Sequence, residues 1–148
     1  MDKMPSLPIE DTLVIDVDKT VCIPEGDYKD RKPYPYIKEL LETLRAAGYK
    51  LHYHTARYMW RTGGNQLKAH ELGYQELKDW MDKYEIPYDQ LYFGKPGGII
   101  IDDMAVYVDS DEPQSWLNVV KRLGFKLDRV DKVKMTDLIQ KTQYNKEN

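Results

Sequence analysis

The 148-residue chain lacks the features that mark secreted and membrane proteins. It has one cysteine, Cys22, so an internal disulfide framework is excluded and a reducing compartment is favoured. No apolar run approaches the roughly 20 residues that a membrane-spanning helix needs, and the mean hydropathy is -0.70. The first residues, MDKMPSLPIEDT, lack the apolar core of a signal peptide. We therefore expect a soluble, cytoplasmic protein with no membrane partner.

A strong excess of one charge is also lacking. The chain carries 22 basic and 25 acidic residues, for a formal net charge of -3, and its isoelectric point is near 5.6. Nucleic-acid-binding domains usually show a basic patch or an overall basic charge, because phosphate contacts dominate their affinity. The composition therefore gives no reason to expect nucleic acid as a partner.

Short apolar runs alternate with stretches of helical periodicity along most of the chain. Runs typical of strands are predicted at residues 12–16, 49–55, 90–94, 98–103 and 105–112. Helices are predicted at residues 36–47, 75–85 and 113–124, and the polar tail after Lys126 is predicted to be frayed. This alternation indicates a mainly parallel sheet between two helical layers. The sequence predicts one Rossmann-like, three-layer α/β domain over residues 1–148, with its core at about 12–125.

Four of the predicted strands end in, or lead directly into, a chemically reactive group: Asp16 and Asp18, Thr55, Lys95, and Asp102 with Asp103. In open parallel sheets ligands bind beyond the carboxyl ends of the strands, so we expect these groups to converge at one edge. Two neighbouring carboxylates at the end of an apolar strand repel each other and are costly to desolvate. A divalent cation would offset that charge.

The residue types at this edge fit phosphoryl chemistry. Magnesium prefers oxygen ligands, usually one or two carboxylates with water and substrate phosphate. A carboxylate can attack phosphorus to form an aspartyl-phosphate, and a second one nearby could protonate the leaving oxygen. A hydroxyl and an ammonium could hold the phosphoryl oxygens and stabilise their charge in the transition state. The set therefore indicates a magnesium-dependent phosphoryl-transfer site.

The same groups, in the same order, occur in the haloacid dehalogenase (HAD) superfamily of phosphohydrolases, which the chain resembles over roughly residues 12–125. DVDKT is similar to the first motif of that family, Thr55 in LHYHTA to the second, Lys95 in FGKP to the third and IIIDD to the acidic fourth. The resemblance implies roles for six residues: Asp16 as nucleophile and metal ligand, Asp18 as general acid/base with its carbonyl on the metal, Thr55 and Lys95 as phosphoryl-binding groups, Asp102 as the main distal metal ligand, and Asp103 as a ligand directly or through water.

Two departures from the family pattern stand out. Only PGGII separates Lys95 from Ile101, where relatives usually carry a helix. Only residues 21–54 lie between Thr20 and Thr55, and a helix and a strand use about half of them. What remains is a flap at about 19–32, too short for a cap domain. An open site of this kind suits a bulky substrate, or one that a neighbouring subunit of a homo-oligomer closes.

Several basic residues are expected to border the site. Arg57 and Arg61 follow Thr55, Lys19 lies inside the first motif, and all three are candidate substrate contacts or ordinary surface residues. Cys22 lies beside the site and could be reactive, but a small buried or flap residue is the favoured interpretation. The flap residues Lys29, Arg31 and Lys32 are weaker candidates for substrate contact.

The segments TARYMWRTGGNQ, YEIPYDQLYFGKPGG and IIIDDMAV resemble short capless phosphatases of capsule and polysaccharide biosynthesis. This resemblance implies a sugar phosphate or another small phosphorylated metabolite as substrate. One alternative is a nucleic-acid 3′-end phosphatase, against which the acidic isoelectric point counts. Another is a receiver-like phosphoacceptor domain, although the lone central aspartate of a receiver is missing before Thr55.

Overall fold

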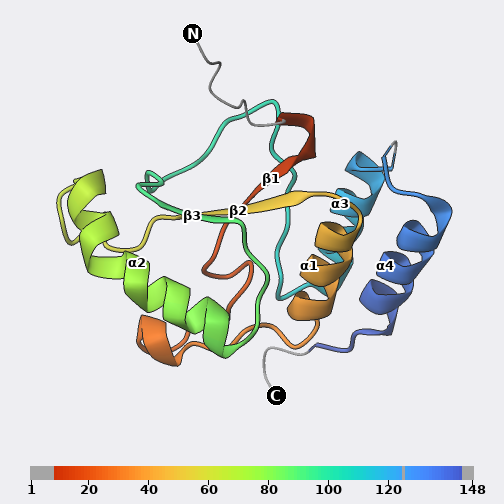
Figure 1. Ribbon diagram of the computed structural model, residues 1–148, viewed down its shortest axis with the longest axis horizontal. Coiled ribbons are helices and arrows are strands. Elements are labelled where there is room, and N and C mark those ends of the chain that lie inside the picture. Colours follow the sequence, from red (N-terminus) through yellow and green to blue (C-terminus); the bar gives the residue numbers. More distant parts are fainter. Residues whose placement is uncertain (1–8, 125, 145–148) are drawn as a thin grey trace, which may run out of the picture.

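The computed structural model describes residues 9–124 and 126–144 and has a parallel sheet at its centre. Strands β1 (Thr12–Ile15), β2 (Lys50–Thr55) and β3 (Gln90–Phe93) lie in the order β1-β2-β3 (Figure 1). Helices α1 to α4 surround this sheet in a single Rossmann-like α/β domain, which confirms the predicted fold class. No helix within the described ranges has the length and apolar character to cross a bilayer.

The strand register brings the carboxyl ends of the three strands to one edge. Ile15 pairs with Tyr53, and Thr55 pairs with Phe93. Chain segments that follow β1, β2 and β3 therefore leave the sheet side by side. This edge is where the sequence predicts the site.

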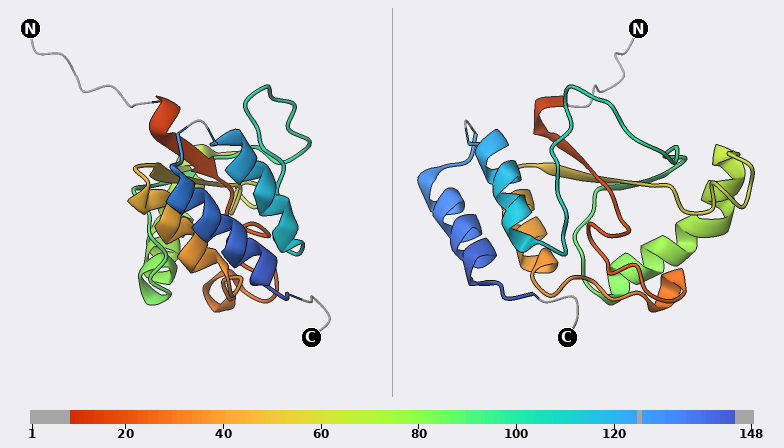
Figure 2. Two further views of the ribbon diagram at one scale, coloured as in Figure 1. Left: turned by 90° about the vertical axis from the view of Figure 1, so that its right-hand side faces the viewer. Right: turned by 180° about the vertical axis from the view of Figure 1, so that it is seen from behind.

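Two groups of helices flank the sheet (Figures 1 and 2). Helix α2 (Gln66–Lys83) contacts β3, whereas α1 (Ile37–Ala46), α3 (Leu117–Arg122) and α4 (Arg129–Lys141) pack together on the other side of the molecule. Within the core, the buried leucines of α1 meet strand side chains such as Leu51 and Tyr53. Burial of these apolar side chains is the main stabilising contribution to such a domain.

One face of the sheet is only partly covered. Ile15, Tyr53 and Leu91, which point to the same side, are buried, but on the opposite side Val14 is 69% exposed and Tyr92 is 43% exposed. Because β1 is the outer strand in the order β1-β2-β3, Val14 lies on an edge strand as well as on the partly covered face.

The predicted strands at 98–103 and 105–112 are wrong, because the structure has no strand in either range. The chain between β3 and the 3₁₀ helix η3 (Pro113–Trp116) is irregular, and its first part stands away from the body of the molecule (teal, left view of Figure 2). Three consecutive isoleucines favour a strand by local pattern, but a strand also needs a neighbour with which to form hydrogen bonds. In the described part of the chain no strand lies beside this segment.

Helix α2 begins at Gln66, nine residues before the predicted start at residue 75. The side chain of Asn65 caps it by accepting a hydrogen bond from the backbone N–H of Lys68 at 3.0 Å. Its first turns are polar, and their leucines, Leu67 and Leu72, are exposed. The apolar stripe that predicts a helix is therefore absent from this part. The predicted helix at 113–124 is η3 followed by α3.

Residues 129–141 of the C-terminal tail are not frayed, contrary to the prediction. They form α4, whose first turn is capped when Asp128 accepts a hydrogen bond from the backbone N–H of Asp131 at 2.8 Å. Met135 and Ile139 are fully buried against the rest of the core. The core therefore extends well beyond residue 125.

We expect Ile139→Ala to lower the free energy of unfolding by about 2–5 kcal/mol, because it deletes buried methyl groups and leaves a cavity. Val133→Ala on the same helix is the control, since Val133 is 52% exposed and its truncation is expected to cost less than about 1 kcal/mol. Urea denaturation measures both. Equal losses for the two variants would contradict the docking of α4.

Candidate functional site

The carboxylate of Asp16 lies at the carboxyl edge of the sheet with two donors around it. Lys95 Nζ donates to Oδ1 at 2.9 Å, and Thr20 Oγ1 donates to Oδ2 at 3.1 Å. The backbone N–H of Lys95 bonds to the carbonyl oxygen of Thr55 at 3.1 Å, which fixes Lys95 beside the end of β2. The side chains of Asp16 and Lys95 are 35% and 22% exposed, so solvent reaches this pair.

A tight turn separates Asp18 from Asp16. Lys19 has a φ of 68°, in the left-handed region that side chains other than glycine rarely adopt, and the backbone N–H of Val21 closes the turn on the carbonyl of Val17 at 2.8 Å. The turn directs the two carboxylates to different partners. Lys19 itself is exposed.

Asp18 is held by three side chains. Arg57 donates through Nε to Oδ2 at 2.9 Å and through Nη2 to Oδ1 at 2.8 Å, a bidentate pair. Arg31 Nη1 lies 2.8 Å from Oδ1, and Cys22 Sγ donates to the same oxygen at 3.1 Å. The Asp18 carboxylate is therefore the centre of a charged cluster beneath the flap.

These contacts set the ionisation of the cluster. Burial acts to raise the pKa of Asp18, but the hydrogen bonds and charge of Arg57, with smaller contributions from Cys22 and Arg31, outweigh it and lower the pKa. Burial and the adjacent Asp18 carboxylate raise the pKa of Cys22 to about 12. Asp18 is thus ionised and Cys22 is a buried, protonated thiol, as expected for a small buried residue.

Arg57, predicted as a substrate contact or surface residue, is 2% exposed and belongs to the Asp18 cluster. Its Cζ lies 4.4 Å from the centroid of the Tyr28 ring, a cation–π arrangement in which Arg31 takes part at 4.7 Å. Its Nη1 is buried and has no hydrogen-bond partner within residues 9–124 and 126–144. The flap is therefore tied to the loop after β2 through Arg57.

Arg61 is exposed, and its Cζ lies 5.1 Å from the centroid of the Tyr58 ring. It lines a hollow of about 370 Å³ between the flap and the loop after β2. Lys29 and Arg31 line the same hollow, together with two carboxylates, Asp27 and Glu76. This hollow adjoins the Asp18 cluster through Arg31.

Thr55 ends β2 as predicted, but its side chain is 1% exposed. Its Oγ1 accepts a hydrogen bond from the backbone N–H of Arg57 at 3.1 Å, which stabilises the turn after the strand. In this arrangement the Thr55 hydroxyl positions Arg57, and it is not open to solvent.

Asp102 and Asp103 do not join the other aspartates. Both are exposed in the irregular segment after β3, where Asp102 Oδ1 accepts a hydrogen bond from the backbone N–H of Met104 at 2.6 Å. In the part of the chain that the structure describes, no three histidine, cysteine or acidic side chains form a group that could hold a metal. Asp16 offers the oxygen ligand that magnesium prefers, but the carboxylates that would complete the set are not assembled in one subunit.

Residues near 110 are site neighbours that the sequence did not single out. Ser110 Oγ donates to the carbonyl oxygen of Thr20 at 2.5 Å, and Tyr36 OH donates to the Ser110 carbonyl at 2.8 Å. Tyr34 OH donates to Asp111 at 2.9 Å. The sequence signal for these residues is the acidic end of AVYVDSDE, but the sequence analysis assigns that segment to a strand and not to the site.

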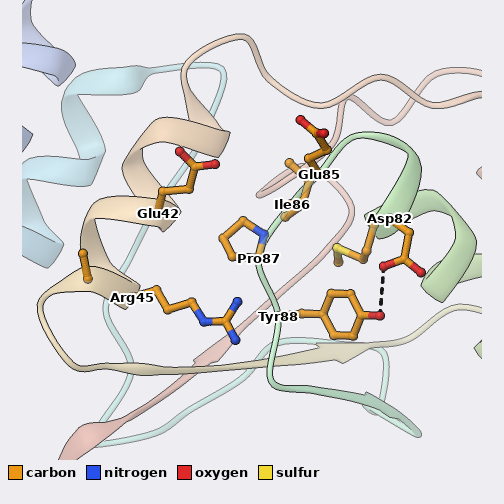
Figure 3. A pocket seen from close by; sticks show the side chains of 9 residues that line it. Glu42, Arg45, Asp82, Glu85, Ile86, Pro87 and Tyr88 are labelled. Carbon is orange, nitrogen blue, oxygen red and sulfur yellow. Dashed lines mark hydrogen bonds between the residues drawn. The ribbon is translucent and has the colours of Figure 1, made fainter.

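A larger hollow of about 650 Å³ lies elsewhere, between α1 and the end of α2 (Figure 3). Its charged side chains include Glu42, Arg45, Asp82 and Glu85, and Tyr88 OH donates to Asp82 at 3.0 Å. None of the predicted site residues lines it. We therefore place the candidate site at the carboxyl edge of the sheet.

Comparison with known proteins gives a likeness in structure. No protein-family model matches the chain, and no curated protein matches it. A crystal structure of a structural-genomics target from Vibrio cholerae is 26% identical in sequence, with a TM-score of 0.63. The match covers 89% of this chain and 98% of that one. The chain is therefore similar, over most of its length, to a bacterial protein of the same α/β architecture.

Proposed function

We propose that the protein is a magnesium-dependent phosphomonoesterase of the HAD type that forms an aspartyl-phosphate on Asp16. The observation that supports this is the pairing of Asp16 with Lys95 at 2.9 Å, at the end of a parallel strand and within reach of solvent. An accessible carboxylate next to a single ammonium group can attack an incoming phosphoryl group while the ammonium attracts its oxygens.

In the first step an Asp16 oxygen attacks phosphorus, the bond from phosphorus to the leaving oxygen breaks, and that oxygen takes up a proton from solvent water. In the second step water attacks the phosphoryl group and regenerates the carboxylate. Lys95 stabilises the negative charge of the phosphoryl oxygens in both steps. The resemblance to HAD phosphatases assigns proton transfer to Asp18, whose carboxylate is held in place by Arg57, Arg31 and Cys22.

Magnesium would be held by Asp16 together with Asp102, Asp103 and the backbone carbonyl of Asp18. The described arrangement supplies only part of this set, so no step above is assigned to the metal.

The proposed substrate is a sugar phosphate or another small phosphorylated metabolite of polysaccharide biosynthesis, in the cytoplasm. The hollow lined by Lys29, Arg31 and Arg61 beside the Asp18 cluster supports a substrate with a second anionic or polar group. Tyr28 and Tyr58, which line the same hollow, offer flat surfaces against which a ring could pack.

The test is phosphate release, with and without magnesium, from a panel of sugar phosphates, nucleotides and a 3′-phosphorylated oligonucleotide. We expect many turnovers on a sugar phosphate, loss of turnover without magnesium, and loss in Asp16→Ala. The control is Asp137→Ala, which removes an exposed carboxylate on α4 and is expected to keep full activity.

Other outcomes separate the alternatives. Turnover that survives in Asp16→Ala would contradict the proposal. A single retained phosphoryl group without turnover would indicate a receiver-like phosphoacceptor. A marked preference for the oligonucleotide would indicate a nucleic-acid end phosphatase.

A further inference from the structure

The segment after β3 exposes a large apolar surface. Ile99 and Ile101 are each 95% exposed and Ile100 is 55% exposed, and two glycines precede them. In an extended chain successive side chains point to opposite sides, so three isoleucines in a row suit a strand that is covered on both faces. An exposed apolar cluster of this size commonly marks an interface.

The outer edge of β1 is a matching surface. β1 is the end strand of the sheet, its carboxyl end leads directly to Asp16, and Val14 at its centre is 69% exposed. An edge strand presents backbone groups that can pair with a further strand. A strand added in parallel would direct its own carboxyl end toward Asp16.

Residues 98–103 cannot reach that position in their own subunit. In a strand beside β1, Asp102 would lie next to Asp16. Gly98 comes four residues earlier, so it would lie about 13 Å nearer the amino end of the sheet, at about 3.3 Å per residue. Lys95 is fixed beside the end of β2 by its bond to the Thr55 carbonyl, so the new strand would also be about 10 Å to the side, two strand spacings away. The three residue steps from Lys95 to Gly98 would have to cover about 16 Å, but an extended chain covers at most about 11 Å.

We propose that residues 98–103 of one copy add as a fourth, parallel strand to the β1 edge of a second copy, in a reciprocal exchange. The exchange is two-fold symmetric and closed, so it forms a dimer and not a chain of copies. A register that pairs Ile100 with Val14 of the partner also pairs Asp102 with Asp16 of the partner, since both pairs are 86 residues apart. Each Asp16 thus gains a carboxylate from the other subunit.

The proposed exchange accounts for two observations. It covers the isoleucines and the open edge of β1, and it supplies the carboxylates missing around Asp16. The structural part stands without the proposed function, whereas the role of Asp102 beside Asp16 rests on it. Lys95 keeps its bond to Asp16 in its own copy, so each site combines residues from both subunits.

Disulfide cross-linking tests the exchange without using activity. Val14→Cys and Ile100→Cys are made as separate variants, unfolded and refolded together at equal concentration, and mildly oxidised. We expect a covalent dimer on a non-reducing gel from the mixture, and native dimers by sedimentation. Cys22 does not interfere because it is fully buried. The matched control is Val14→Cys mixed with Val133→Cys, which places an exposed thiol on α4.

Two results would overturn the exchange. One is a monomer by sedimentation with no cross-link in the mixture. The other is a cross-link only when both cysteines are in the same chain, giving an internally linked monomer. That second result would mean that the segment reaches β1 of its own copy.

Activity complementation tests the shared site, with p-nitrophenyl phosphate and magnesium as the probe. Asp16→Ala and Asp102→Ala are each expected to be inactive. When they are refolded together at equal concentration, half of the dimers are mixed and each has one intact site of two, so about a quarter of wild-type activity returns. An inactive mixture beside an active wild type would overturn the shared site. An inactive wild type would count against the proposed function instead, and the cross-link would still decide the exchange.

Discussion

Asp18→Asn is expected to lower the free energy of unfolding by about 3–5 kcal/mol, the usual cost of leaving one member of a buried ion pair without its partner. Arg57 is 2% exposed and donates through both Nε and Nη2 to the Asp18 carboxylate. Its Nη1 already has no partner in the described part of the chain. An amide in place of the carboxylate would leave the buried guanidinium charge uncompensated.

Urea denaturation measures this loss, with Glu85→Gln as the control. Glu85 pairs with Lys38 at 2.9 Å, but its side chain is 76% exposed, so the variant is expected to cost less than about 1 kcal/mol. The double variant Asp18→Asn/Arg57→Met, which removes both charges, is expected to recover part of the stability. An equal loss for Asp18→Asn and Glu85→Gln would contradict a buried pair.

The pH dependence of the same variants gives a second check. Because the pKa of Asp18 is lowered in the folded state, its ionisation stabilises the fold above its unfolded pKa. That contribution is lost as the pH falls through the folded pKa. The stability difference between the wild type and Asp18→Asn is therefore expected to be constant near neutral pH and to shrink in acid. A difference that grows on acidification would contradict this assignment.

Lys95→Met is expected to lower kcat by about 10²- to 10³-fold, with a small change in stability. If Asp16 receives the phosphoryl group, Lys95 is the cation placed to stabilise its oxygens, and removal of one such donor has an effect of this order. The pair is partly exposed, so its loss is expected to change the free energy of unfolding by about 1 kcal/mol or less.

Steady-state kinetics on the best substrate of the panel measure the effect of Lys95→Met. The control is Lys78→Met on α2, which breaks an exposed pair with Asp82 far along the helix from the site. Unchanged kcat in Lys95→Met, with the substrate saturating, would remove Lys95 from the proposed chemistry.

Elements whose burial pattern lies within a single segment were predictable from the sequence. Ile37, Leu40, Leu41 and Leu44 recur at helical spacing, and all four are fully buried in α1. The three strands that form the sheet were predicted at nearly their observed bounds for the same reason. In each case the local pattern and the tertiary environment agree.

The fold departs from prediction where a neighbour, not a local pattern, decides the outcome. Helix α4 is polar over most of its surface, and only Met135 and Ile139 are buried. The isoleucines at 99–101 have the pattern of a strand, but all three are exposed and no strand lies beside them in the described part of the chain. Neither the docking of α4 nor the position of that segment is encoded in periodicity.

The candidate site was likewise predictable only in part. The order of motifs along the chain led us to expect Asp16 and Lys95 at one edge, and the structure joins them by a 2.9 Å hydrogen bond. The bidentate pair between Arg57 and Asp18 could not be expected, because it depends on the turn at Lys19 and on a separation of 39 residues. An arginine that follows a strand could pair with many different acidic groups, and only the three-dimensional structure shows which one it contacts.

The open edge of β1 has a consequence for how the protein behaves when newly made. A strand edge beside an exposed apolar segment is a template for indiscriminate association, which can end in aggregates. If the partner's segment occupies that edge, the contact that completes each site also removes this hazard. Dilution would then favour monomers, which are both inactive and prone to aggregate. The concentration of the protein would therefore govern its lifetime as well as its catalytic activity.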